Sequence, residues 1–76
     1  MQAFLEYIVK GLAQHPGAVN VTPVERAGAT IYELRLEPSD VGKIIGRQGR
    51  NVRALRTLLS AAGVRARKRY TLEVID

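Results

Sequence analysis

Residues 41–52 read Val41-Gly42-Lys43-Ile44-Ile45-Gly46-Arg47-Gln48-Gly49-Arg50-Asn51-Val52. Glycine stands at both ends of the stretch Gly46–Gly49, where the backbone can turn sharply and a sugar-phosphate strand can come close to the main chain. Apolar residues at helical spacing flank this stretch, which predicts a loop between two helices. Because the second helix would begin at the loop, its free N–H groups and the positive end of its dipole would face any phosphate bound there.

The helix ahead of the loop is predicted to be short. Pro38 disfavours helical backbone at the residue before it, and Ser39 with Asp40 then offers an N-cap and an anion in the first turn. Gly46 should end this helix after little more than a turn or two.

The helix after the loop is predicted to run from about Gly49 to Ala62, with Gly63 as its C-terminal cap. One side of it would pack against the rest of the chain through Val52, Leu55, Leu58 and Leu59. Its first arginines follow one another at steps of three residues and form a slowly drifting stripe beside the loop: Arg50, Arg53 and Arg56.

The chain before residue 38 predicts a helix and two strands. Gln2–Gln14 carries apolar residues at helical spacing, and residues 15–17 supply a stop. Val19–Arg26 and Thr30–Glu37 are rich in β-formers, and the break at residues 27–29 favours a hairpin. Pro23 has no donor for a sheet ladder, which indicates that the first strand lies at a sheet edge.

A last strand is predicted around residues 70–74, where apolar and polar residues alternate. Two helices join it to the second strand, so these two strands are expected to lie parallel with a right-handed crossover. The predicted fold is α+β in the order α-β-β-α-α-β, with all helices on one face of a three-stranded mixed sheet. One domain, residues 1–76, suits the chain length. Its expected core is Leu5, Ile8, Leu12, Leu34, Leu36, Ile44, Leu55, Leu59, Leu72 and Val74.

Positive charge is concentrated in one part of the sequence. The net charge is +5, and nine of the twelve basic residues lie between Lys43 and Arg69, without one acidic residue among them. Such segregation projects a positive patch toward a partner that bears phosphates. In this patch Arg47 adds charge at the loop tip, while Arg65, Arg67, Lys68 and Arg69 are most simply solvated charge.

Several classes of protein are disfavoured. The chain has one histidine and no cysteine, so it lacks the usual sets of nucleophile and base or of metal ligands, and we expect neither an enzyme nor a cofactor or small-molecule substrate. No apolar run reaches the length of a membrane span, and residues 1–6 place no basic region ahead of an apolar one. A soluble, cytoplasmic protein without a membrane partner is expected.

The stretch 41–52 resembles the signature of the KH domain family, V-G-x-I-I-G-x-x-G-x-x-[VI], which spans two short helices and their loop. The element order is similar to the type II arrangement, and the resemblance covers nearly the whole chain. It implies a small bacterial RNA-binding protein in which the loop clamps about four nucleotides of backbone.

The resemblance also implies which residues bind. Gly46, Arg47, Gln48 and Gly49 would hold the RNA backbone, and Val41, Gly42 and Ile45 would form an apolar groove floor on which bases rest. Arg53 and Arg56 match helix positions expected beside the RNA, with Arg50 at the start of the same stripe. The implied role is an RNA chaperone or post-transcriptional regulator that forms a homodimer or joins a larger KH protein.

Two other functions use the same basic face. A helix-turn-helix domain would read duplex DNA, although Val52, Leu55 and Leu59 commit much of the second helix to packing. A protein-interaction module would bring the basic face against an acidic partner. Binding to single-stranded RNA compared with duplex DNA separates the first alternative from the KH interpretation.

Overall fold

The three strands form one sheet in the order β1-β2-β3 in the computed structural model of the chain, which describes residues 1–75. The last residue of the predicted domain 1–76 lies outside the described part. The elements are α1 (Gln2–Leu12), a 3-10 turn (Pro16–Ala18), β1 (Asn20–Arg26), β2 (Ala29–Arg35), α2 (Pro38–Ile45), a second 3-10 turn (Arg47–Gly49), α3 (Arg50–Ala66) and β3 (Arg69–Ile75).

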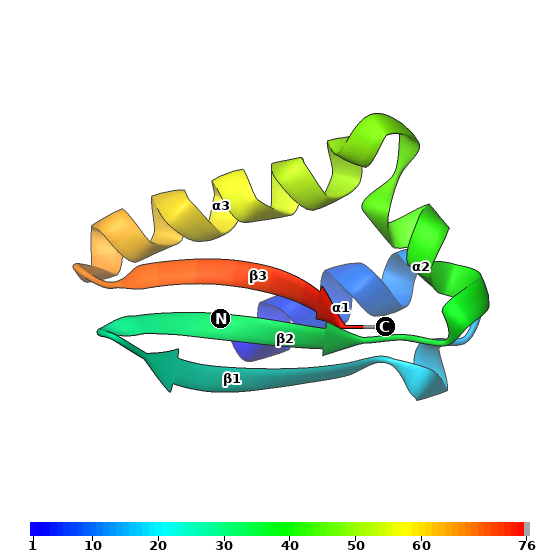
Figure 1. Ribbon diagram of the computed structural model, residues 1–76, viewed down its shortest axis with the longest axis horizontal. Coiled ribbons are helices and arrows are strands. Elements are labelled where there is room, and N and C mark those ends of the chain that lie inside the picture. The colour runs from blue at the N-terminus through cyan, green and yellow to red at the C-terminus, as the bar shows by residue number, and fades with distance from the viewer. Residues whose placement is uncertain (76) are drawn as a thin grey trace.

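The sheet topology confirms the prediction. β1 pairs antiparallel with β2, and β2 pairs parallel with β3. Pro23 therefore lies on an edge strand, where its missing donor is harmless. Along β2 the side chains of Thr30, Tyr32 and Leu34 are buried while those between them are half-buried. α1 lies behind the sheet and α3 runs beside β3 (Figure 1).

The hairpin turn is tighter than predicted. Ala27 and Gly28, with φ of 53° and 80°, make a two-residue turn in which both central residues are left-handed, as in type I′ hairpins. Ala29 consequently already pairs with Arg26, and β2 begins one residue earlier than expected. β2 also ends at Arg35, before the predicted end at Glu37, because Glu37 serves as the N-cap of α2.

α1 ends at Leu12 and not at the predicted Gln14. The backbone N–H groups of Gln14 and His15 donate to the carboxylate of Asp40 instead of continuing the helix. Asp40 lies in the first turn of α2 as predicted, but that helix starts at Pro38 with Glu37 as its N-cap, so Ser39 is not the cap.

α3 runs past the predicted cap Gly63 to Ala66, and Arg67, in the left-handed region with φ of 56°, closes it. Gly63 has another use. A Cβ at this position would lie 2.5 Å from the carbonyl oxygen of Lys68, whose N–H donates to the Gly63 carbonyl at 2.7 Å. Gly63 therefore lets the start of β3 pack directly against the helix.

The core confirms most of the predicted list. Six of its members are buried, namely Leu5, Leu34, Ile44, Leu55, Leu59 and Leu72, and three pack partly buried against them, namely Ile8, Leu36 and Val74. The prediction that Leu12 lies in the core was wrong: its side chain, on the last residue of α1, is 43% exposed. Leu58, predicted on the packing side of α3, is also exposed. The core also includes residues that the predicted list left out, namely Val9, Val19, Val21, Tyr32 and Val52.

Candidate nucleic-acid interface

The glycine loop between α2 and α3 has a backbone that requires glycine at Gly46 and favours it at Gly49. Gly46 has φ 79° and ψ 171°, a combination that is essentially limited to glycine. Gly49 is left-handed at φ 73°, and its N–H donates to the Gly46 carbonyl at 3.1 Å. Gln48 between them is also left-handed at φ 56°, which is uncommon for a side chain of this kind. The predicted turn is therefore tight, and its uncommon backbone conformation needs contacts from the surrounding residues to stabilise it.

Asn51 holds the loop from the first turn of α3. Its Nδ2 donates to the carbonyl of Lys43 at 3.0 Å and so links the start of α3 to the end of α2. A Cβ on Gly46 would lie 2.7 Å from Asn51 Cγ, which means that glycine is also needed for this close approach. Asn51 was not among the functional residues predicted from the sequence. Its short amide near a helix start, the kind that bonds nearby backbone, is the only signal that the sequence offers.

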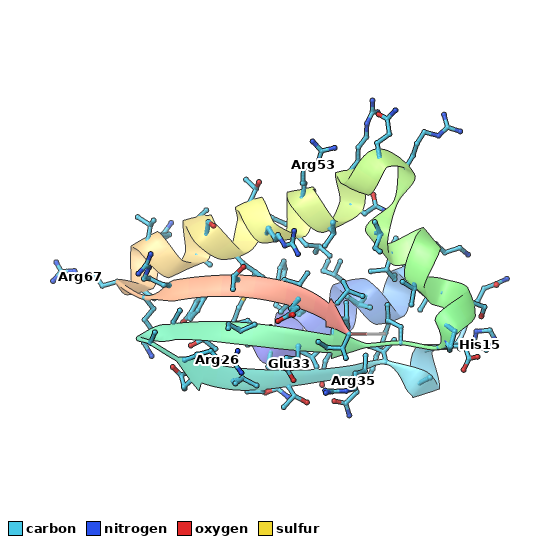
Figure 2. All side chains as sticks on the ribbon, viewed as in Figure 1. His15, Arg26, Glu33, Arg35, Arg53 and Arg67 are labelled. Carbon is cyan, nitrogen blue, oxygen red and sulfur yellow. The ribbon has the colours of Figure 1, made fainter. Side chains whose placement is uncertain are left out.

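Arg53 holds the second half of the loop, also from α3. Its Nη2 donates to the Gln48 carbonyl at 2.6 Å, and its Nε lies 3.4 Å from the Gly49 carbonyl. Figure 2 shows this side chain on α3, close to the loop. Arg53 thus brings positive charge to the loop and also fixes the orientation of the peptide groups there.

Arg56, predicted to lie beside the ligand, is tied to the sheet. Its Nε donates at 3.0 Å to the carbonyl of Leu72 in β3. β3 is an edge strand, so this bond satisfies a carbonyl that no neighbouring strand reaches. The bond uses Nε alone, and the two terminal nitrogens are not needed for it. The sequence did not identify Leu72 as a partner, because the contact joins residues sixteen apart.

The predicted apolar floor lies on one face of α2. Val41 and Ile45 are half-buried, and Gly42 between them is exposed, with open space where a Cβ would lie. Asp40 and Ile44 point inward on the other side and are buried. α2 therefore offers a small apolar surface with a gap at Gly42, next to the loop.

Asp40 fixes the position of α2. Its side chain is 1% exposed, and its two carboxylate oxygens accept the N–H groups of Gln14 at 3.1 Å and His15 at 2.9 Å. The His15 Nδ1 lies 3.3 Å from the same carboxylate. Burial acts to raise the pKa of this carboxyl, but the hydrogen bonds and the neighbouring His15 outweigh it, and the pKa is lowered.

The cations around the loop are not neutralised by carboxylates within residues 1–75. The close contacts between basic and acidic side chains there join His15 to Asp40 and Arg35 to Glu33, both away from the loop. The basic residues gathered near the loop are all exposed: Lys43, Arg47, Arg50, Arg53 and Arg56.

Within residues 1–75, no group of three or more His, Cys, Asp or Glu is placed to hold a metal ion. No helix in the same range is long and apolar enough to cross a membrane.

The structure brings the predicted site residues of α2, the loop and the first two turns of α3 into one region. The other basic cluster does not join them. Arg65, Arg67, Lys68 and Arg69 lie where α3 passes into β3, at the opposite end of α3 from the loop, as the position of Arg67 in Figure 2 indicates.

The chain is similar to known proteins over almost its whole length. The profile of a family described as "KhpA/KhpB, KH domain" matches residues 2–74. A protein named RNA-binding protein KhpA from Treponema pallidum is 47% identical over 75 residues, which cover 99% of this chain and 94% of that protein. Proteins with the same name from Borreliella burgdorferi and Chlamydia muridarum are 47% and 41% identical, over 95% and 100% of this chain and 88% and 97% of theirs.

Proposed function

This chain belongs to the KhpA/KhpB family of KH domains, and from that premise we propose that it binds single-stranded RNA at the glycine loop. Gly46–Gly49 would hold the sugar-phosphate backbone of about four nucleotides. Val41, Gly42 and Ile45 would carry the bases, and Arg50, Arg53 and Arg56 would lie along the strand. The relatives' name, RNA-binding protein KhpA, supports RNA as the ligand.

The observation that carries the proposal is the backbone of the loop. Gly46 has a glycine-only conformation, and the loop that it opens leads into the N-terminus of α3, where the helix dipole favours a phosphate. Exposed arginines surround it, and no carboxylate of residues 1–75 pairs with them. A loop that served only as a turn would not need this concentration of unpaired charge.

The test compares ligands and salt concentrations. Fluorescence anisotropy with short single-stranded RNA should give affinities on the order of micromolar, and a duplex DNA of equal charge should bind more weakly. For four or five phosphate contacts, the slope of log affinity against log salt should be roughly −3, at about −0.7 per contact. A slope near zero, or tighter binding to duplex DNA, would contradict the proposal, and the second result would favour the helix-turn-helix alternative.

A second protein chain is the other proposed partner, either another copy of this chain or a larger KhpB-like KH protein. Apolar side chains exposed on α1 and α3 support it, since Phe4 is 42% and Leu58 is 52% exposed. A second RNA site would raise affinity through effective concentration. Light scattering of the pure protein should give a mass above one 8.4 kDa chain. A monomer at every concentration, with no KH protein in a native pull-down, would exclude both forms.

The proposed cellular role is that of a cytoplasmic RNA chaperone or post-transcriptional regulator. A clamp on about four nucleotides carries little sequence information, which suits a protein that contacts many transcripts. Crosslinking in cells followed by sequencing of the bound RNA would test this role. Many targets that share no long motif are expected, and recovery of one structured RNA alone would contradict it.

A further inference from the structure

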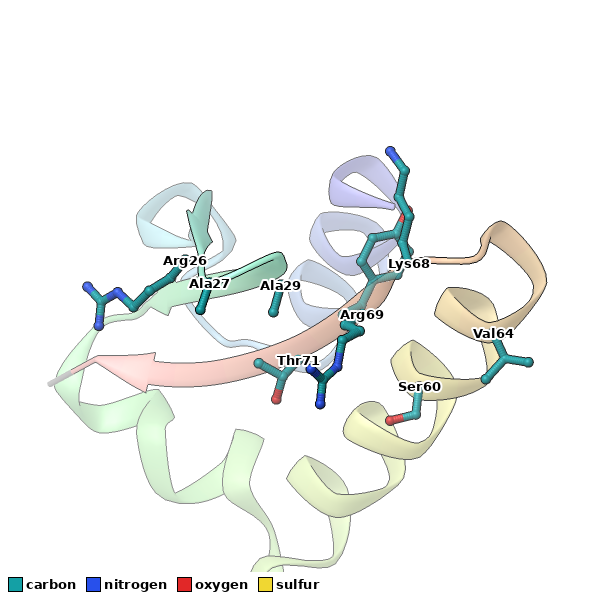
Figure 3. Close-up of a pocket in the computed structure, with 9 residues that line it drawn as sticks. Arg26, Ala27, Ala29, Ser60, Val64, Lys68, Arg69 and Thr71 are labelled. Carbon is teal, nitrogen blue, oxygen red and sulfur yellow. The ribbon is translucent and has the colours of Figure 1, made fainter.

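A hollow of about 510 Å³ lies at the far end of α3 from the glycine loop. Figure 3 shows it between the hairpin turn, the start of β3 and the last turns of α3. Its size falls within the range of sites that take small ligands or parts of larger ones. The proposed RNA clamp makes no use of it.

Three cations line the hollow: Arg26, Lys68 and Arg69. Arg26 and Arg69 both pair with Ala29 across the sheet, so they stand on either side of a residue with a very small side chain. Neither arginine belongs to an ion pair within residues 1–75. Arg26 and Arg69 thus lie on the two strands beside Ala29, and no carboxylate within residues 1–75 pairs with either of them.

The remaining lining offers both apolar and hydroxyl groups. Val64 is 77% exposed on α3 and borders the hollow together with Ser60. Thr71 is exposed on β3 beside them. Cations beside apolar and hydroxyl-bearing surface suit a nucleotide, whose phosphate needs charge and whose base and sugar need apolar contact and hydrogen bonds.

One face of α3 connects the loop to the hollow. Arg53, Arg56, Ser60 and Val64 follow at steps of three and four residues, so they lie on the same side of the helix. Arg53 contacts the loop, Arg56 contacts β3 and Ser60 lines the hollow. From Gly49 to Val64 the helix rises about 22 Å, at about 1.5 Å per residue. A strand clamped at the loop and following this face would arrive at the hollow.

We infer that the hollow is a second binding site for the same RNA strand, in which Arg26 and Arg69 hold phosphates of nucleotides beyond those at the loop. The inference rests on the proposed RNA binding and extends it. A stacked strand advances about 3.4 Å per nucleotide, so about 22 Å corresponds to about six nucleotides, or fewer if the strand is extended. With the four nucleotides at the loop, the full site would therefore take up to about ten nucleotides.

The experiment compares strand length, salt and two matched variants of the full chain. Arg26→Ala/Arg69→Ala removes the two arginines of the hollow. Arg35→Ala/Lys10→Ala removes the same charge from exposed positions elsewhere on the sheet and on α1. Binding of single strands of about four and about twelve nucleotides is measured between about 50 and 200 mM salt. Thermal melting of both variants checks that they are folded.

For the parent protein, the salt slope on the longer strand should be steeper by about 1.4 than on the shorter one, at about 0.7 per added phosphate contact. The advantage of the longer strand should accordingly shrink about sevenfold over the fourfold rise in salt. Arg26→Ala/Arg69→Ala should abolish this extra slope and leave binding of the short strand unchanged. The control variant should keep the extra slope.

Three results would overturn the inference. The first is a parent protein that binds both strands with the same slope. The second is an equal loss in both double variants, which would indicate diffuse attraction without a site. The third is an Arg26→Ala/Arg69→Ala variant that still shows the full extra salt slope on the longer strand. In each of these the short strand still binds, so the loop proposal stands. A protein that binds neither strand would instead refute the proposed function, and this inference with it.

Discussion

Replacing Gly46 by alanine perturbs the loop at the position where its geometry is most demanding. The new Cβ would lie 2.7 Å from Asn51 Cγ, closer than real contacts allow, and the backbone at φ 79° and ψ 171° excludes side chains. Asn51 would have to move and give up its bond to the Lys43 carbonyl.

The magnitude follows from two contributions to the free energy of unfolding. Backbone strain of this kind costs about 1–3 kcal/mol. Loss of a hydrogen bond costs about 0.5–1.5 kcal/mol more. The sum is about 1.5–4.5 kcal/mol, and at about 4–8 °C per kcal/mol for a domain of this size the melting temperature should fall by about 6–36 °C.

Circular dichroism during thermal and urea unfolding measures the effect, at one protein concentration because association would also shift the midpoint. Gly42→Ala is the matched control. Gly42 lies within α2 in open space, and alanine in a helix is favoured over glycine by about 0.8–1.0 kcal/mol. The control should therefore gain stability, and it should lose RNA affinity because its methyl group would fill the proposed groove. A Gly46→Ala protein as stable as the parent would refute the described loop geometry.

Two further predictions concern residues that position the site. Asp40→Asn should destabilise the fold at pH 7. Because folding lowers the pKa of Asp40, its carboxylate stabilises the fold above about pH 4. The difference in the free energy of unfolding between the parent and the variant should therefore shrink as the pH falls below that value. Urea unfolding of both proteins from pH 7 to pH 3 measures this, and a difference that grows on acidification would contradict it. Arg56→Lys keeps the charge but cannot reproduce the bond from Nε to the Leu72 carbonyl, so it should cost about 1 kcal/mol of stability in urea unfolding. Because the charge is kept, the salt slope for RNA should stay near its parent value, and a variant as stable as the parent would contradict the role of this bond.

The sequence predicted what depends on local pattern. Glycine at 46 and 49 between two apolar helical segments located the loop, and the alternation of Tyr32, Leu34 and Leu36 located the central strand, although that strand ends one residue before Leu36. These features and the order of elements predicted the mixed sheet, because general rules govern how the chain connects the strands of a sheet.

What the sequence could not predict depends on contacts between distant residues. Asp40 was predicted only as part of a helix start, yet its side chain is buried, and the N–H groups of residues 14 and 15 donate to it. Gly63 reads as a helix stop, but its actual role is set by the approach of Lys68. Arg56 was predicted to lie beside the RNA, and its bond to β3 forms only because the strand lies beside the helix.

The most direct test of the central claim is the affinity of the double variant Arg47→Asp/Gln48→Asp for a single-stranded RNA of about four nucleotides. Both side chains are exposed, and Asp at the left-handed position 48 is tolerated at least as well as Gln, so the melting temperature should barely change.

The matched control, Arg35→Asp/Lys10→Gln, changes the net charge by the same amount on the sheet and on α1. Affinity should collapse for the loop variant, because repulsion replaces attraction where the phosphates lie closest, and should fall only slightly for the control. A loop variant that melts like the parent and still binds the RNA as tightly would show that Gly46–Gly49 is only a turn and that RNA binds elsewhere.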